Sequence, residues 1–66
     1  MSGELPLAPC SRLIREAGAK RVSEGAAEEL RDELERYAAE RAQEAKKVAE
    51  HAGRNTVQKG DLEVTR

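Results

Sequence analysis

The sequence predicts an all-α protein, and three observations support this prediction. The 66-residue chain contains 11 alanines and a glutamate-rich middle, and both residue types favour helix. Between Gly25 and Gly53 the chain has no proline or glycine, so one helix can run through the whole region. Gly18 and Gly53 then mark stops on either side of it. The expected order is a short helix, a long helix and a short helix.

The first helix is expected over residues 9–17. Pro9 can occupy the first turn without losing a hydrogen bond. Leu13 and Ile14 fall on one face. Gly18 can adopt the left-handed conformation that closes a helix.

The long helix is expected to begin near Glu24, because Ser23 is a good N-cap and glutamates follow it where the helix dipole favours negative charge. Its apolar residues recur every three or four positions, which indicates a single packing face. The residues on this stripe are Ala27, Leu30, Leu34, Tyr37, Arg41, Ala45, Val48 and Ala52. After Gly53, Thr56 and Val57 suggest a short extended segment, and residues 60–66 leave room for about two helical turns.

The apolar content is too small for a private core. Six leucines, one isoleucine and four valines are present, without phenylalanine or tryptophan, and 38% of the residues are charged. Chains this poor in large apolar residues seldom fold alone. We therefore expect an obligate homodimer with crossed long helices. Its core would contain Leu30, Leu34, Tyr37 and Val48.

Composition also excludes several classes of protein. One cysteine, Cys10, and one histidine, His51, permit neither an internal disulfide nor a clustered metal site. We expect no cofactor, no metal, no small-molecule substrate and no catalytic machinery. No apolar run is long enough to span a membrane, so the expected protein is soluble and cytoplasmic. Residues 1–8 are assigned to an N-terminal lead segment and residues 9–66 to one domain.

Charge is distributed unevenly along the chain. Residues 1–23 carry four basic and two acidic groups, residues 24–52 carry five and nine, and residues 53–66 carry three and two. A polyanion would be attracted to the two ends and repelled by the long helix. Ion pairs four residues apart, such as Asp32 with Arg36, offer an alternative explanation without any polyanion.

Three segments together resemble the archaeal histones, at the spacing of that family. They are residues 4–9 (ELPLAP), 17–23 (AGAKRVS) and 51–57 (HAGRNTV), with Asp61 following. The resemblance covers residues 4–63. It implies the histone fold, in which two chains clasp around their long helices, and the binding of double-stranded DNA by a chromosome-associated protein.

The resemblance also implies which residues contact DNA. The first loop of one chain would lie beside the second loop of its partner, so that Arg21 would enter the minor groove near Arg54, Asn55 and Thr56. A further site at the dimer centre would use Arg12 and Arg15 of the paired first helices. Lys20, next to Arg21, is a further candidate for DNA contact. Arg15 and Lys20 can also be explained as ordinary surface charges. Contacts of this kind depend on phosphates and groove shape, so little sequence preference is expected.

Two further roles follow from the resemblance. Arg54 and Asp61 would form a salt bridge that braces the second loop. His51 would contact Asp61 of a neighbouring dimer, giving a tetramer, or would simply interact with the dipole at its helix end.

Departures from the family pattern support a second hypothesis. Glu33, Arg41 and Lys46 stand where relatives usually carry aliphatic residues, so they must reach solvent, pair with each other, as Glu33 and Lys46 could across the crossing helices, or weaken the dimer. Asn55 and Gln58 stand where lysines are common. The leading hypothesis is a DNA-compacting histone, and the alternative is a histone-fold dimerisation module with weak or no DNA binding.

Overall fold

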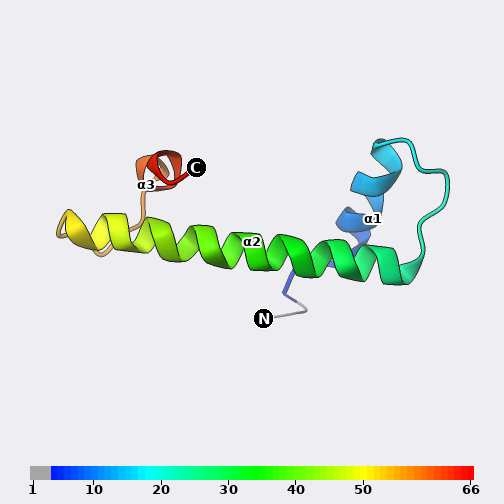
Figure 1. Ribbon diagram of the computed structural model, residues 1–66, viewed down its shortest axis with the longest axis horizontal. Helices are drawn as coiled ribbons and strands as arrows, with labels where there is room; N and C mark the ends of the chain where they lie inside the picture. The colour runs from blue at the N-terminus through cyan, green and yellow to red at the C-terminus, as the bar shows by residue number, and fades with distance from the viewer. Residues whose placement is uncertain (1–3) are drawn as a thin grey trace. The chain divides into compact units, whose positions relative to one another are not determined.

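The computed structural model describes residues 4–66, and the first three residues of the expected lead segment lie outside this range. The described chain contains three α-helices and no strand, which confirms the all-α prediction (Figure 1). They are α1 (Leu7–Glu16), α2 (Glu24–His51) and α3 (Lys59–Val64). The chain forms two compact units, Met1–Arg36 and Tyr37–Arg66, and α2 contributes to both.

Helix α1 begins two residues before the predicted start and ends one residue before the predicted end. Pro6 is extended, with φ −72° and ψ 154°, and Leu7 is the first helical residue. Pro9 is therefore the third helical residue. The first four N–H groups of a helix have no partner within it, so a proline at that position loses no hydrogen bond. This is why Pro9 does not mark the helix start.

Glycines end both α1 and α2, as predicted. Gly18 has φ 115° and Gly53 has φ 73°, both in the left-handed region. The Gly18 N–H donates to the Arg15 carbonyl at 2.9 Å, and the Gly53 N–H donates to the Glu50 carbonyl at 2.9 Å. In each case the next residue donates to the carbonyl one position earlier. This pair of hydrogen bonds satisfies carbonyls that the helix end would otherwise leave unpaired.

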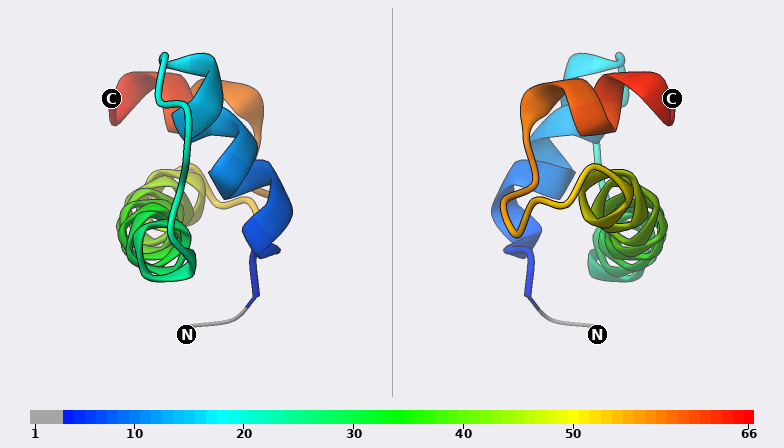
Figure 2. Two further views of the ribbon diagram at one scale, coloured as in Figure 1. Left: turned by 90° about the vertical axis from the view of Figure 1, so that its right-hand side faces the viewer. Right: turned by 90° about the vertical axis from the view of Figure 1, so that its left-hand side faces the viewer.

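Helix α2 is a continuous helix of 28 residues, seen nearly end-on in Figure 2. The Ser23 Oγ accepts a hydrogen bond from the Ala26 N–H at 3.1 Å. Ser23 is therefore the N-cap of α2, and the prediction for this helix start is confirmed.

In the first unit, α1 packs against the beginning of α2 through small residues. Cys10 is 3% exposed and Ala27 is 2% exposed. The Cys10 thiol donates to the Pro6 carbonyl at 3.5 Å. The Leu5 N–H donates to Glu35 Oε2 at 2.7 Å, which fixes the chain just before α1. A buried carboxylate on α2 thus positions the start of the first helix.

In the second unit, α3 folds back beside the later part of α2, where Ala45 and Ala49 are buried. Arg41 donates to the Leu62 carbonyl at 2.6 Å and to the Thr65 Oγ1 at 2.8 Å. The sequence did not predict these partners, because the pairing expected for Arg41 was with Glu33 or Lys46. The observed partner groups are uncharged and lie at the C-terminal end of α3, where the helix dipole favours a cation.

The buried core of the described chain consists of small residues. Its apolar members are Cys10, Ala27, Ala45 and Ala49. Most of the large apolar side chains stay in contact with solvent, and the most exposed are Leu5, Leu13, Tyr37, Val57, Leu62 and Val64. No helix within residues 4–66 is long and apolar enough to cross a membrane.

Candidate nucleic-acid interface

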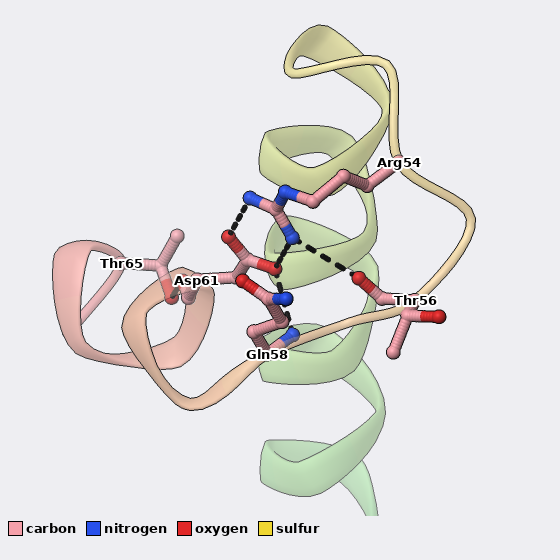
Figure 3. A network of polar contacts seen from close by, with 5 residues as sticks. All are labelled: Arg54, Thr56, Gln58, Asp61 and Thr65. Atoms are coloured by element: carbon pink, nitrogen blue, oxygen red, sulfur yellow. Dashed lines mark hydrogen bonds and ion pairs between the residues drawn. The ribbon is translucent and has the colours of Figure 1, made fainter.

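The loop between α2 and α3 is braced by a bidentate ion pair (Figure 3). Arg54 Nη1 donates to Asp61 Oδ2 at 2.9 Å, and Arg54 Nη2 donates to Asp61 Oδ1 at 2.8 Å. Asp61 is 3% exposed, whereas Arg54 keeps about a third of its side chain in solvent. Two parallel bonds fix the plane of the guanidinium as well as its distance. The structure thus brings these two predicted residues together.

Two more hydrogen bonds tie this ion pair to the loop backbone. The Gln58 N–H donates to Asp61 Oδ2 at 2.8 Å, and Arg54 Nη1 donates to the Thr56 carbonyl at 3.1 Å. The first of these caps the N-terminus of α3, because Asp61 is the third residue of that helix and Gln58 is its N-cap. Residues 54–58 are consequently held at both ends of the loop by one aspartate.

These contacts alter the acidity of both partners. The hydrogen bond from Arg54, followed by that from the Gln58 backbone, lowers the pKa of Asp61 from 3.8 to about 2. The hydrogen bond to Asp61 raises the pKa of Arg54 above its ordinary value. Both residues are therefore charged at neutral pH, and the brace is fully formed there.

The remaining predicted DNA-binding residues are exposed. Arg12 and Arg15 lie on α1, and Lys20 and Arg21 lie in the loop before α2. Asn55 and Thr56 are exposed in the loop before α3. The first four belong to the first unit and the last two to the second. The juxtaposition of Arg21 with the second loop of a partner chain stays a prediction.

His51 is the last residue of α2 and is exposed beside a shallow depression lined by Lys47, Glu50 and His51 itself. Both carboxylate oxygens of Asp61 are occupied within the chain. The contact of His51 with Asp61 of a neighbouring dimer also stays a prediction.

The four residues predicted for the dimer core are not buried within the chain. Leu30, Leu34 and Val48 are partly exposed, and Tyr37 is 61% exposed. All four lie on α2 and share one side of it, because their spacing places them within about 60° of each other around the helix axis.

Sequence reasoning did not identify the roles of Glu35, Gln58 and Thr65. Glu35 is 5% exposed, and its Oε1 is buried without a hydrogen-bond partner among the described residues. Thr65 accepts from Arg41 and donates to carbonyls of α3. The spacing of Gln58 and Asp61 is that of a capping box, which was a usable signal for Gln58. Within residues 4–66 no group of three potential metal ligands comes together.

Comparisons with known proteins place these features in a family. A family model described as "Histone-like transcription factor (CBF/NF-Y) and archaeal histone" matches residues 3–65. The chain is 56% identical over 59 residues to one of the subunits of archaeal histone HAN1 from Thermococcus zilligii, a match that covers 89% of this chain and 88% of the relative. It is 46% identical, with the same coverage, to probable archaeal histone 3 of Methanocaldococcus jannaschii. Histones are structural proteins and not enzymes, in agreement with the expectation from the sequence that the chain has no catalytic machinery. The chain belongs to the family of histone-like transcription factors and archaeal histones.

Proposed function

We propose that this protein is a histone that binds double-stranded DNA without strong sequence preference and organises chromosomal DNA as a homodimer. The observation that supports it most is the second loop, where the family match coincides with a loop shaped by the Arg54–Asp61 ion pair. Exposed basic residues on α1 and in the first loop supply the charge that phosphates require.

In the proposed binding mode, Arg54 mainly shapes the second loop, and other residues make most of the contacts to DNA. Asp61 occupies two donors of Arg54, so Arg54 mainly fixes the loop and presents its remaining N–H groups to a phosphate. Asn55 and Thr56, exposed beside it, donate through side chain and backbone. Arg21 enters the minor groove, while Arg12 and Arg15 contact phosphates at the dimer centre. Such contacts respond to groove width and deformability more than to base identity.

The homodimer is supported by the apolar side chains that the chain leaves uncovered. Tyr37 is 61% exposed and shares one side of α2 with Leu30, Leu34 and Val48, none of which is buried. Contiguous exposed apolar side chains of this kind mark an interaction site. The name of the Thermococcus zilligii relative describes one of the subunits of a histone. The competing assembly is therefore a mixed dimer with a second histone. Sedimentation of the purified chain separates the two, because a pure homodimer supports the proposal and a monomer contradicts it.

DNA binding is tested by fluorescence anisotropy with a duplex of about 60 base pairs at several salt concentrations. With roughly four to six phosphate contacts per dimer, the slope of log affinity against log salt should be about −4 to −5. Arg21→Ala should abolish most of the binding. Arg36→Ala removes an exposed arginine from α2 and serves as the matched control, which should bind as the parent does.

A second function is favoured by specific residues. The net charge is −1, and Asn55 and Gln58 replace lysines that relatives commonly carry, so the chain could instead serve as a histone-fold dimerisation module. A parent dimer that does not bind duplex even at low salt would establish this alternative. Salt-dependent binding that Arg21→Ala removes would exclude it.

A further inference from the structure

The middle of α2 presents an exposed aromatic residue between two opposite charges. Tyr37 is 61% exposed and lies at the midpoint of the helix Glu24–His51. Glu33 precedes it by four residues and Arg41 follows it by four. At about 100° per residue, these two side chains lie roughly 40° to either side of Tyr37. Glu33 and Arg41 are therefore equally far from Tyr37 and carry opposite charges.

Apolar side chains surround Tyr37 on the same side of α2. By the same periodicity Leu30 and Val48 lie about 20° from Tyr37, and Leu34 lies about 60° from it. None of the three is buried within the chain. We call this surface the Tyr37 face, and it consists of Leu30, Glu33, Leu34, Tyr37, Arg41 and Val48.

We propose that, where the two long helices of the homodimer cross at the Tyr37 face, Glu33 of each chain pairs with Arg41 of the other. This inference rests on the homodimer of the proposed function and specifies its register. A two-fold axis at Tyr37 places each residue before it opposite the residue equally far after it in the partner. Glu33 then meets Arg41 twice, once on each side of the axis.

Both side chains have hydrogen-bonding groups left for this contact. Four residues of helix span about 6 Å along its axis, and packed helices lie about 8 to 10 Å apart, which is within the combined reach of a glutamate and an arginine. Glu33 is exposed and forms no ion pair within residues 4–66. Arg41 uses one donor for the Leu62 carbonyl and one for Thr65, so three of its five donors remain.

The same register avoids unfavourable contacts. Glu40 would lie opposite Leu34, and Glu44 opposite Leu30, so neither of these glutamates faces a carboxylate. Lys46 follows Tyr37 by nine residues and therefore projects from the opposite side of α2, about 180° away. Glu33 consequently has Arg41, and not Lys46, as its partner across the crossing. Charge pairs beside an apolar contact contribute more to register and partner choice than to affinity.

The test is a double-mutant cycle on the full chain, with dimer dissociation measured by sedimentation. Glu33→Arg and Arg41→Glu each bring like charges together twice, so each should weaken the dimer by about tenfold or more. The double variant should recover most of this loss. An equimolar mixture of the two single variants should form a mixed dimer tighter than either variant alone, because one chain then carries two arginines and the other two glutamates.

Arg41→Glu also removes the contacts to α3, but this loss is common to the single and double variants and cancels in the coupling between them. A second measurement does not depend on Arg41. In a Cys10→Ser background, Tyr37→Cys should be joined to its partner by a short bis-maleimide, whereas Lys46→Cys, on the opposite side of α2, should not.

The outcomes separate the register from the function. A parent chain that sediments as a monomer contradicts both the homodimer and this inference. A dimeric parent with additive charge reversals, or with efficient cross-linking at position 46 and none at 37, overturns the register alone. DNA binding is measured separately and does not enter this comparison.

Discussion

The two carboxylate oxygens of Asp61 accept hydrogen bonds from three donors. Two of the donors belong to Arg54 and the third is the backbone N–H of Gln58. Only an ionised carboxylate can accept from all of them, since an amide offers one acceptor oxygen and turns N–H groups toward the other donors. A glutamate would place its carboxylate one methylene further from α3. The shape of the second loop therefore depends on the charge of this residue and on its length.

The lowered pKa of Asp61 makes part of the stability depend on pH. The group has a pKa of about 2 in the folded chain, against 3.8 ordinarily. Its contribution is therefore complete above about pH 5 and is lost progressively as the pH falls through about 2. We expect Asp61→Asn to lower the melting temperature at pH 7 by roughly 5 to 10 °C. This difference from the parent should shrink steadily between about pH 5 and about pH 2, as followed by circular dichroism.

Glu63→Gln is the matched control for this effect. Glu63 is exposed, and its Oε2 lies 3.8 Å from Arg66 Nη2. Exposed ion pairs of this kind contribute little to stability. The melting curve of this variant should follow that of the parent at every pH. If Asp61→Asn were equally neutral at pH 7, the aspartate would not brace the loop.

The sequence predicts the contacts of some residues and not those of others. Arg54 and Asp61 belong to a recognisable motif, so their pairing could be expected from the resemblance. Glu35 could not be distinguished from the other acidic residues of α2, because its partner is the backbone N–H of Leu5, thirty residues earlier. Arg41 likewise binds a carbonyl and a hydroxyl on α3. Because almost every residue carries a backbone N–H and C=O, the spacing of residue types does not show which backbone group a side chain will bind.

At the level of elements, the start of α2 depends on Ser23. Its hydroxyl oxygen accepts the Ala26 N–H, which would otherwise lack a partner within the helix. We expect Ser23→Ala to lower the free energy of unfolding by about 1 kcal/mol, measured by urea denaturation. Ser23→Asp keeps an acceptor at the same position and should retain the parent stability. Equal loss in both variants would show that the cap contributes nothing.

Helix ends provide a second prediction, through two glycines with open surroundings. A methyl group added at Gly53 or Gly60 meets no atom within 4 Å, but Gly53 has φ 73° whereas Gly60 lies within α3. Gly53→Ala should therefore destabilise the fold by about 1 kcal/mol through backbone strain. Gly60→Ala should be neutral or stabilising by up to about 1 kcal/mol, because alanine favours helix. Thermal unfolding of the two variants would decide, and a loss at Gly60 equal to that at Gly53 would contradict the argument.

Elements could be predicted more completely than contacts, for a physical reason. Ser23, Gly18 and Gly53 act on their own neighbours, so their effects are visible in a short stretch of sequence. The predicted start of α1 lies two residues after the observed one, because proline is tolerated throughout the first turn and Pro9 therefore marks a region and not a single residue. Local signals locate helices and leave their partners undetermined.

For the whole molecule, the comparison of buried and exposed apolar side chains indicates that the chain associates with another chain. Within residues 4–66, four small residues, Cys10, Ala27, Ala45 and Ala49, form the apolar part of the core. Burying them offsets little of the entropy lost by ordering the chain. The large side chains that would offset more are Leu30, Leu34, Tyr37 and Val48, which share one side of α2 and are not buried. Stability should therefore come mainly from covering this side with another chain.

The last prediction follows from that balance. If folding and dimerisation are one process, dilution favours the unfolded chain, and the melting temperature must rise with protein concentration. For a dimer of two 66-residue chains, whose unfolding entropy scales with size, the expected rise is about 5 °C for each tenfold increase. Circular dichroism melts from about 1 to 100 μM would measure it. A melting temperature that does not change with concentration would mean that the single chain is stable with its large apolar side chains in water, and that association adds nothing to its folding.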